Sequence, residues 1–97
     1  MHVLALSIEL HLPESRSLKS RRAVVKPLVE GLRRRYGVSA AEVAHQQTWQ
    51  RVEIGVAVVS GTVHHATEVI DEVERFVWSH PEVQVLSMSR SWLEVDR

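Results

Sequence analysis

Residues 45–51 read HQQTWQR and gather polar and aromatic side chains directly before an apolar alternation, VEIGVAVVS. Trp49 can stack on a nucleic-acid base or enter a partner's pocket, and Arg51 can pair with a phosphate. The glutamines Gln46, Gln47 and Gln50 can supply adaptable hydrogen bonds. Trp and Arg are enriched in interfaces, so we predict partner contacts from four residues: His45, Gln47, Trp49 and Arg51. The alternative is a hairpin held by Trp49 packing and by glutamine side chains bonded to the loop backbone.

The second candidate site is a group of basic side chains that are concentrated in one segment. Twelve Lys and Arg balance twelve Asp and Glu, but eight of the twelve basic residues lie between Arg16 and Arg35. At about 100° per residue, Lys19, Arg22, Lys26 and Arg33 fall on one flank of a helix, with Arg16 in the preceding loop. A helix N-terminus favours anions, so the pattern predicts an anion- or RNA-binding surface of Arg16, Lys19, Arg22 and Lys26. The alternative is a solvated helix face.

Catalytic, cofactor and metal sites are not predicted. His64 and His65 are adjacent and point in different directions on a helix, and the other four histidines lack ligand spacing along the chain. Acylphosphatases with a ferredoxin-like fold use an Arg after the first strand and an Asn near the third. Arg16 could fill the first role, but the chain contains no Asn. Neither a Ser/His/Asp constellation nor a Gly-rich phosphate loop is evident, so we expect a protein that is not an enzyme.

The composition indicates a cytoplasmic protein. The chain has no Cys, which excludes a disulfide scaffold. Its first twelve residues lack the basic start and cleavage site of a signal peptide, and no apolar run is long enough for a membrane span. The absence of Asn and the ten Arg against two Lys hint at a thermophile.

Apolar periodicity predicts six elements within one domain of 97 residues. Alternation of period two predicts strands over residues 2–12, 39–45, 50–60 and 82–95, the last with a bulge near Val85 and Leu86. Helical spacing predicts helices over residues 18–36 and 63–78, capped by Ser17 and Thr62. Gly37 should end the first helix, and Pro27 should bend or split it.

The predicted order is βαββαβ, with one apolar stripe on each helix. Right-handed crossovers then give an α+β, ferredoxin-like sandwich: a four-stranded antiparallel sheet, strand order 4-1-3-2, with both helices on one face. The other face would carry mostly small residues: Ala5, Ser7, Glu9 and His11 from the first strand, and Arg51, Glu53, Gly55, Ala57 and Val59 from the third. Such a face meets solvent or lets a second subunit approach closely.

Two stretches, IELHLPESRSLKSRRAVVK and AEVAHQQTWQRVEIGVAVVS, resemble the YlxP-like family of small bacterial proteins of unknown function. The resemblance extends over nearly the whole chain. It implies a ferredoxin-like fold and a genomic setting among translation-initiation and ribosome-maturation genes, without an established activity. Ala44, Gln47 and Pro27 depart from the family's pattern.

These observations together favour a non-catalytic, cytoplasmic binding module without a cofactor, associated with RNA or the ribosome through the basic helix and the Trp49/Arg51 hairpin. The alternative is a homodimeric structural or small-ligand-sensing domain in which the small-residue sheet face or the hairpin is the contact between subunits and the basic stripe is only solvated. Salt dependence separates the two classes, because phosphate contacts weaken steeply with salt and apolar contacts do not.

Overall fold

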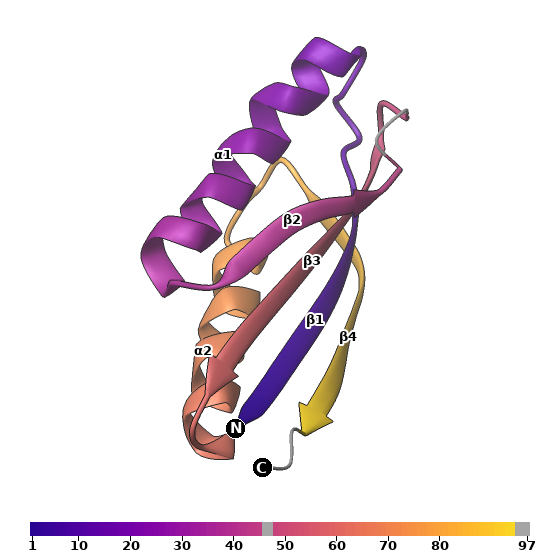
Figure 1. Ribbon diagram of the computed structural model, residues 1–97. Helices are drawn as coiled ribbons and strands as arrows, with labels where there is room; N and C mark the ends of the chain where they lie inside the picture. Colours follow the sequence, from indigo (N-terminus) through magenta and orange to yellow (C-terminus); the bar gives the residue numbers. More distant parts are fainter. Residues whose placement is uncertain (46–47, 95–97) are drawn as a thin grey trace.

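The computed structural model describes residues 1–45 and 48–94 (Figure 1). It contains six elements: β1 (His2–His11), α1 (Leu18–Tyr36), β2 (Ser39–Ala44), β3 (Arg51–Ser60), α2 (Val63–Trp78) and β4 (Gln84–Glu94). The predicted βαββαβ order is confirmed, and no boundary differs from its predicted position by more than two residues.

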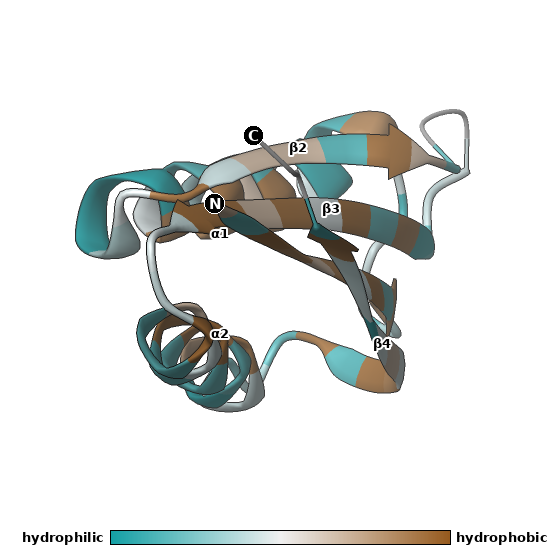
Figure 2. Cartoon of the chain, turned by 60° about the horizontal axis from the view of Figure 1, so that its bottom comes forward, coloured by the Kyte–Doolittle hydropathy of each residue, from teal (hydrophilic) through white to brown (hydrophobic). Residues whose placement is uncertain are grey.

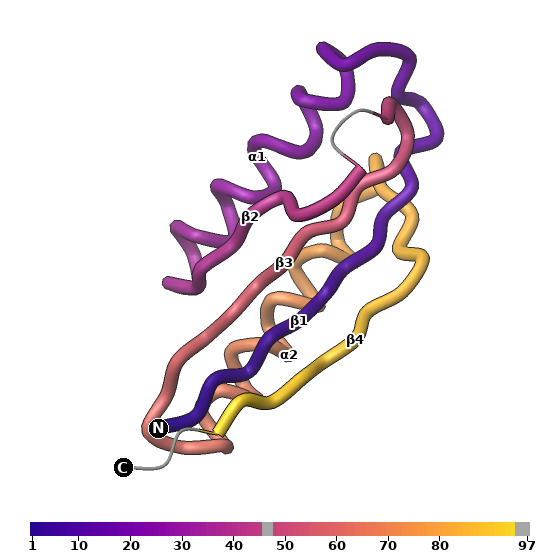
Figure 3. The backbone as a smooth tube through the Cα atoms, turned by 45° about the vertical axis from the view of Figure 1, so that its right-hand side comes forward, coloured from indigo at the N-terminus to yellow at the C-terminus, as the bar shows by residue number. Residues whose placement is uncertain are grey.

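The strands form one antiparallel sheet in the order β2-β3-β1-β4, which is the predicted 4-1-3-2 arrangement in reverse (Figure 3). Helix α1 packs against the edge strand β2, and α2 packs against the two central strands (Figures 1 and 3). Both helices cover the same face of the sheet, so the opposite face is left open. This is the ferredoxin-like sandwich that the sequence predicted.

Period-two alternation along the central strands builds the core. The even-numbered residues 4–10 of β1 and 52–58 of β3, including Leu6, Ile8 and Ile54, are buried under the helices, while their neighbours lie on the open face. In Figure 2 the strands carry alternating apolar and polar bands accordingly. The helices complete the core with one buried stripe each, which includes Leu32 in α1 and Ile70 in α2.

Side-chain caps fix where the helices begin. The Ser17 hydroxyl accepts a hydrogen bond from the Ser20 backbone N–H, and the Ser20 hydroxyl accepts one from the Ser17 N–H, both at 3.0 Å. Thr62 accepts a bond from the His65 N–H at 3.1 Å. Helix α1 ends at Gly37, whose φ of 63° is the left-handed conformation that glycine adopts without a steric penalty. All three predicted end signals are therefore confirmed.

Helix α1 continues through Pro27 without a break, so the predicted alternative of two separate helices is wrong. Pro27 lies on the exposed side of the helix, where water can satisfy the carbonyl that loses its donor. Farther along the buried side, Gly31 lies against Phe76 of α2, and a Cβ at this position would come within 3.0 Å of the Phe76 ring. The absence of a side chain at Gly31 is what allows the two helices to meet there.

Two bulges interrupt the sheet. The first lies in β4, where Leu86 is the extra residue between the partners of Glu9 and Leu10, and it confirms the predicted irregularity. The second lies in β2 at Val43 and was not predicted. The Val43 side chain packs over Gly55, 3.1 Å from where a Cβ would be, and thus covers part of the open face.

Candidate functional site

The four residues of the predicted anion-binding surface lie at the N-terminal end of α1 and in the loop before it. Arg16, Lys19, Arg22 and Lys26 are all exposed. Among the residues that the structure describes, none of these four side chains forms an ion pair with a carboxylate. Their positive charge is therefore available to a ligand.

A groove of about 470 Å³ runs between α1 and the edge strand β2. Arg22 and Lys26 line it, whereas Arg16 and Lys19 are not among its lining residues. Arg33 crosses the groove, because its Nε donates a hydrogen bond of 2.8 Å to the Ala40 carbonyl oxygen. The lining comprises four basic side chains, two acidic ones and three apolar ones: Arg21, Arg22, Lys26, Arg33, Glu30, Glu42, Leu18, Val25 and Val29. The groove therefore has an excess of positive charge.

Arg21 is the buried member of the basic segment, and its role was not predicted. Its side chain is 6% exposed and pairs with the Glu42 carboxylate of β2. The same Nη2 donates to the carbonyl oxygens of His45 and Arg51, at 3.0 and 3.2 Å. The sequence did contain a signal, because Arg21, Val25 and Leu28 follow the i, i+4, i+7 spacing of the buried stripe. Arg21 therefore connects α1 to both ends of the loop between β2 and β3.

Hydrogen bonds of polar side chains, rather than packing of Trp49, hold the hairpin together. Thr48 donates through Oγ1 to the carbonyl oxygens of His45 and Arg51, at 2.9 and 3.2 Å. Gln50 donates from Nε2 to the Ser15 carbonyl oxygen at 3.1 Å, which joins the hairpin to the loop before α1. Trp49 is 54% exposed, which favours a contact surface over a packed anchor. Two glutamines of the predicted contact segment, Gln46 and Gln47, lie outside the described residues.

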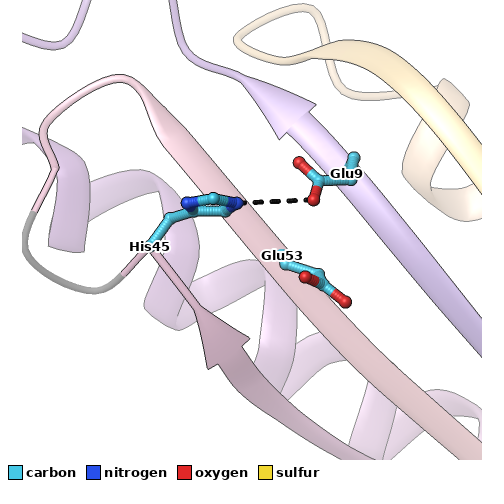
Figure 4. Close-up of side chains that lie close together, drawn as sticks. All are labelled: Glu9, His45 and Glu53. Carbon is cyan, nitrogen blue, oxygen red and sulfur yellow. Dashed lines mark hydrogen bonds and ion pairs between the residues drawn. The ribbon is translucent and has the colours of Figure 1, made fainter.

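His45 points from the hairpin toward Glu9 on the open sheet face (Figure 4), and Arg51 pairs with the same carboxylate. Arg51 Nη2 lies 2.8 Å from Glu9 Oε2, and His45 Nε2 lies 3.4 Å from Glu9 Oε1. The Arg51 hydrogen bond is the main cause that lowers the pKa of the Glu9 carboxyl, against the opposing effect of desolvation, and His45 lowers it further. Glu9 is therefore ionised at neutral pH, and it already neutralises part of the positive charge of Arg51.

Glu53 completes a group on this face. It is directly opposite Glu9 in the pairing of β1 with β3, and its Oε2 accepts a hydrogen bond of 2.9 Å from the Ser7 hydroxyl. One ligand atom each from Glu9, His45 and Glu53 lie within 4.8 Å of one another. We refer to these three residues as the open-face triad. The prediction of no metal ligands rested on spacing along the chain, which does not reveal a group assembled from separate strands.

The middle of the open face is a shallow depression, and Ser7, which lines it, also donates the hydrogen bond to Glu53. It is lined mostly by small side chains from all four strands, among them Ala5, Gly55, Ala57 and Ser89. Two large apolar residues, Val59 and Leu93, are 63% and 60% exposed. They lie on the same face, because each is the cross-strand partner of Val3.

In the described part of the chain, neither helix is long and apolar enough to span a bilayer.

Comparison with known proteins agrees with this fold. A de novo designed protein with a ferredoxin fold, solved by NMR in solution, superposes with a TM-score of 0.53 over 99% of this chain and 89% of its own, at 14% identity. At that identity the likeness concerns the fold alone. The uncharacterized protein YlxP of Bacillus subtilis (strain 168) is 33% identical over 76 residues, which cover 78% of this chain and 83% of YlxP.

The family model described as "Protein of unknown function (DUF503)" matches residues 3–90, a stretch that includes every predicted site residue and the whole open-face triad. The resemblance to YlxP-like proteins noted from the two sequence stretches is thereby confirmed. The chain belongs to the DUF503 family of proteins of unknown function.

Proposed function

We propose that this protein is a non-catalytic module that binds RNA, in the ribosome or in another RNA-containing complex of the cytoplasm. The observation that carries the proposal is the group of four exposed cations, Arg16, Lys19, Arg22 and Lys26, without carboxylate partners in the described structure. Arg16 and Lys19 lie at the N-terminus of α1, and Arg22 and Lys26 line the groove with excess positive charge. Phosphates are the groups that such a surface attracts most strongly.

The hairpin supplies a second contact at the same end of the molecule. The Gln50 hydrogen bond to Ser15 places the β2–β3 hairpin next to the loop that carries Arg16 (Figure 1). Trp49 thus lies near the basic surface and offers an exposed ring on which an unpaired base can stack. Arg51 was expected to pair with a phosphate, but it has less free positive charge for this role because Glu9 already binds its guanidinium. Single-stranded RNA is therefore the expected ligand.

Neutralising two of the groove cations, Arg22→Gln with Lys26→Gln, is expected to weaken RNA binding and its salt dependence. Each lost phosphate contact lowers the slope of log K against log salt by about 0.7 for a single strand, so the double variant should lose about 1.4. The measurement is fluorescence anisotropy with a single-stranded RNA at several salt concentrations, supported by co-sedimentation with ribosomal subunits. The matched control is Arg34→Gln with Arg75→Gln, which removes the same charge elsewhere.

Equal losses in the two double variants would mean that only net charge matters and would reject a defined surface. Trp49→Ala provides a further arm of the experiment. It should weaken RNA binding by about tenfold, because stacking of one base contributes about 1 to 3 kcal/mol. Stability should stay within about 0.5 kcal/mol, as is usual for exposed positions. A large stability loss with unchanged RNA affinity would show that Trp49 is a structural residue.

The second candidate function is a homodimeric domain built on the open face. The depression lined by small residues lets two backbones approach closely, and Val59 and Leu93 offer apolar area beside it. If so, the wild type should sediment as a dimer, and Ala57→Arg should raise the dimer dissociation constant at least tenfold by placing a charge in the depression. A wild type that sediments as a monomer at high concentration contradicts this candidate.

A further inference from the structure

We propose that the open-face triad, Glu9, His45 and Glu53, binds a divalent transition-metal ion, with zinc as the best-fitting occupant. The three residues come from β1, from the residue after β2 and from β3, and one ligand atom of each lies within 4.8 Å of the others. Figure 4 shows His45 and Glu9 facing each other, with Glu53 beside them. This site is separate from the basic surface of α1, which lies on the other side of the sheet.

The separation of His45 and Glu9 is long for a direct hydrogen bond and also matches that of two ligands on one ion. His45 Nε2 and Glu9 Oε1 are 3.4 Å apart, whereas a charge-assisted N–H···O hydrogen bond is about 2.7 to 2.9 Å long. Two ligands about 2.1 Å from a tetrahedral zinc ion lie about 3.4 Å apart. The remaining separations, all within 4.8 Å, shorten when the half-buried Glu53 side chain rotates about its bonds.

The charge at the triad also attracts a cation. Glu9 and Glu53 are direct cross-strand partners, an arrangement in which two like charges destabilise a sheet unless a positive charge offsets them. Arg51 offsets one of the two, so a net charge of about −1 remains when His45 is neutral. Arg51 binds Oε2 of Glu9 and leaves Oε1 directed at His45.

Outer hydrogen bonds hold two of the ligands. Ser7 donates a hydrogen bond to Glu53 Oε2, and Arg51 donates one to Glu9 Oε2. In metal sites, hydrogen bonds from residues that do not touch the metal commonly orient the ligands in this way. These contacts come from the two central strands, each of which is paired with a neighbouring strand on both sides. Glu9 is thus already held in place for an ion, whereas Glu53 reaches the ion by rotating about its side-chain bonds.

The donor set selects the class of ion. Imidazole nitrogen favours zinc and other late transition metals over magnesium and calcium, which prefer all-oxygen sites. Three protein ligands, one nitrogen and two carboxylates, leave a fourth tetrahedral position on the exposed side of the sheet for water. Zinc accepts this mixture of ligands and this geometry.

The test is a calorimetric titration of the metal-free full-length chain with Zn²⁺, followed by NMR of the histidine ring nitrogens. The wild type is expected to bind one ion per chain with a shift of the His45 ring signals. His45→Asn and Glu53→Gln should each weaken binding at least tenfold, because each removes a ligand. Asn is chosen because it tolerates the positive φ of 65° at His45 and thus preserves the backbone.

The matched controls are His11→Asn, which removes an imidazole from the same face outside the triad, and Glu14→Gln, which removes an exposed carboxylate. Both should bind Zn²⁺ as the wild type does. The proposal is overturned if the wild type binds no Zn²⁺, if the triad variants bind it unchanged, or if the controls lose it equally. Equal affinity for Mg²⁺ would also overturn it, because an unselective carboxylate pair would then account for binding.

Discussion

Ile54→Ala is expected to lower the free energy of unfolding by about 2 to 5 kcal/mol, through lost burial and the cavity left behind. Ile54 is 0% exposed in the middle of β3 and is the cross-strand partner of Ile8, which is also 0% exposed. Both side chains lie in the layer between the sheet and the helices. Because strands on both edges and a helix over the buried face hold the β3 backbone, the site has little room to collapse around a smaller side chain.

Urea denaturation of the two proteins measures this effect, as a shift of the midpoint at unchanged slope. For a domain of this size, each kcal/mol corresponds to a fall in melting temperature of about 4 to 8 °C. Val59→Ala is the control in the same strand, since Val59 faces the open side and is 63% exposed. It should stay within about 0.5 kcal/mol. A loss below about 1 kcal/mol for Ile54→Ala would mean that the register of β3 is wrong.

Arg21→Met is expected to destabilise the fold by about 3 kcal/mol, which is the lower end of the range for breaking a buried ion pair. The change removes the cation that pairs with Glu42 and that donates to the His45 and Arg51 carbonyl oxygens. Glu42 keeps a 22% exposed side chain, so water offsets part of the lost pairing. Methionine retains the volume and flexibility of the arginine stem, so the loss reports on polar contacts more than on packing.

The neighbouring Arg22→Met is the matched control, because the same chemical change at an exposed position should cost less than about 0.5 kcal/mol. A double variant with Glu42→Leu should recover part of the loss, since it also removes the carboxylate that Arg21 neutralises in the wild type. Equal stability of the Arg21 and Arg22 variants would refute the structural role of Arg21. Thermal and urea unfolding of the four proteins provide the comparison.

The consequences of Arg21 extend to the candidate sites. Through the His45 carbonyl oxygen it connects α1, which carries the basic surface, with the residue that completes the open-face triad. A loss of Arg21 should therefore loosen the hairpin end from which both Trp49 and His45 project. Variants meant to test RNA or zinc binding are better chosen at Arg22, Lys26 or His45, where the hairpin support stays intact.

The sequence by itself determined the elements and their order, because their signals are local. Period-two alternation in β1 and β3 and the single stripes of α1 and α2 record which side of each element is buried. Ser17, Thr62 and Gly37 mark helix ends through contacts with residues at most four positions away. Few arrangements can bury all these faces with short connections, so the ferredoxin-like fold follows from the pattern.

The tertiary structure alone decided which charged groups meet. Glu9 and Glu53 were both expected on the open face, but their direct opposition depends on the register of β1 against β3, two strands joined through a helix and a third strand. No turn of fixed length sets that register; it depends on the packing of α2 and the core side chains against the two strands. The pairing of Arg21 with Glu42 likewise depends on how closely α1 approaches β2. Periodicity assigns a side chain to one face of its element. Which side chain it meets there depends on segments distant in sequence, and those segments come together only when the layers pack.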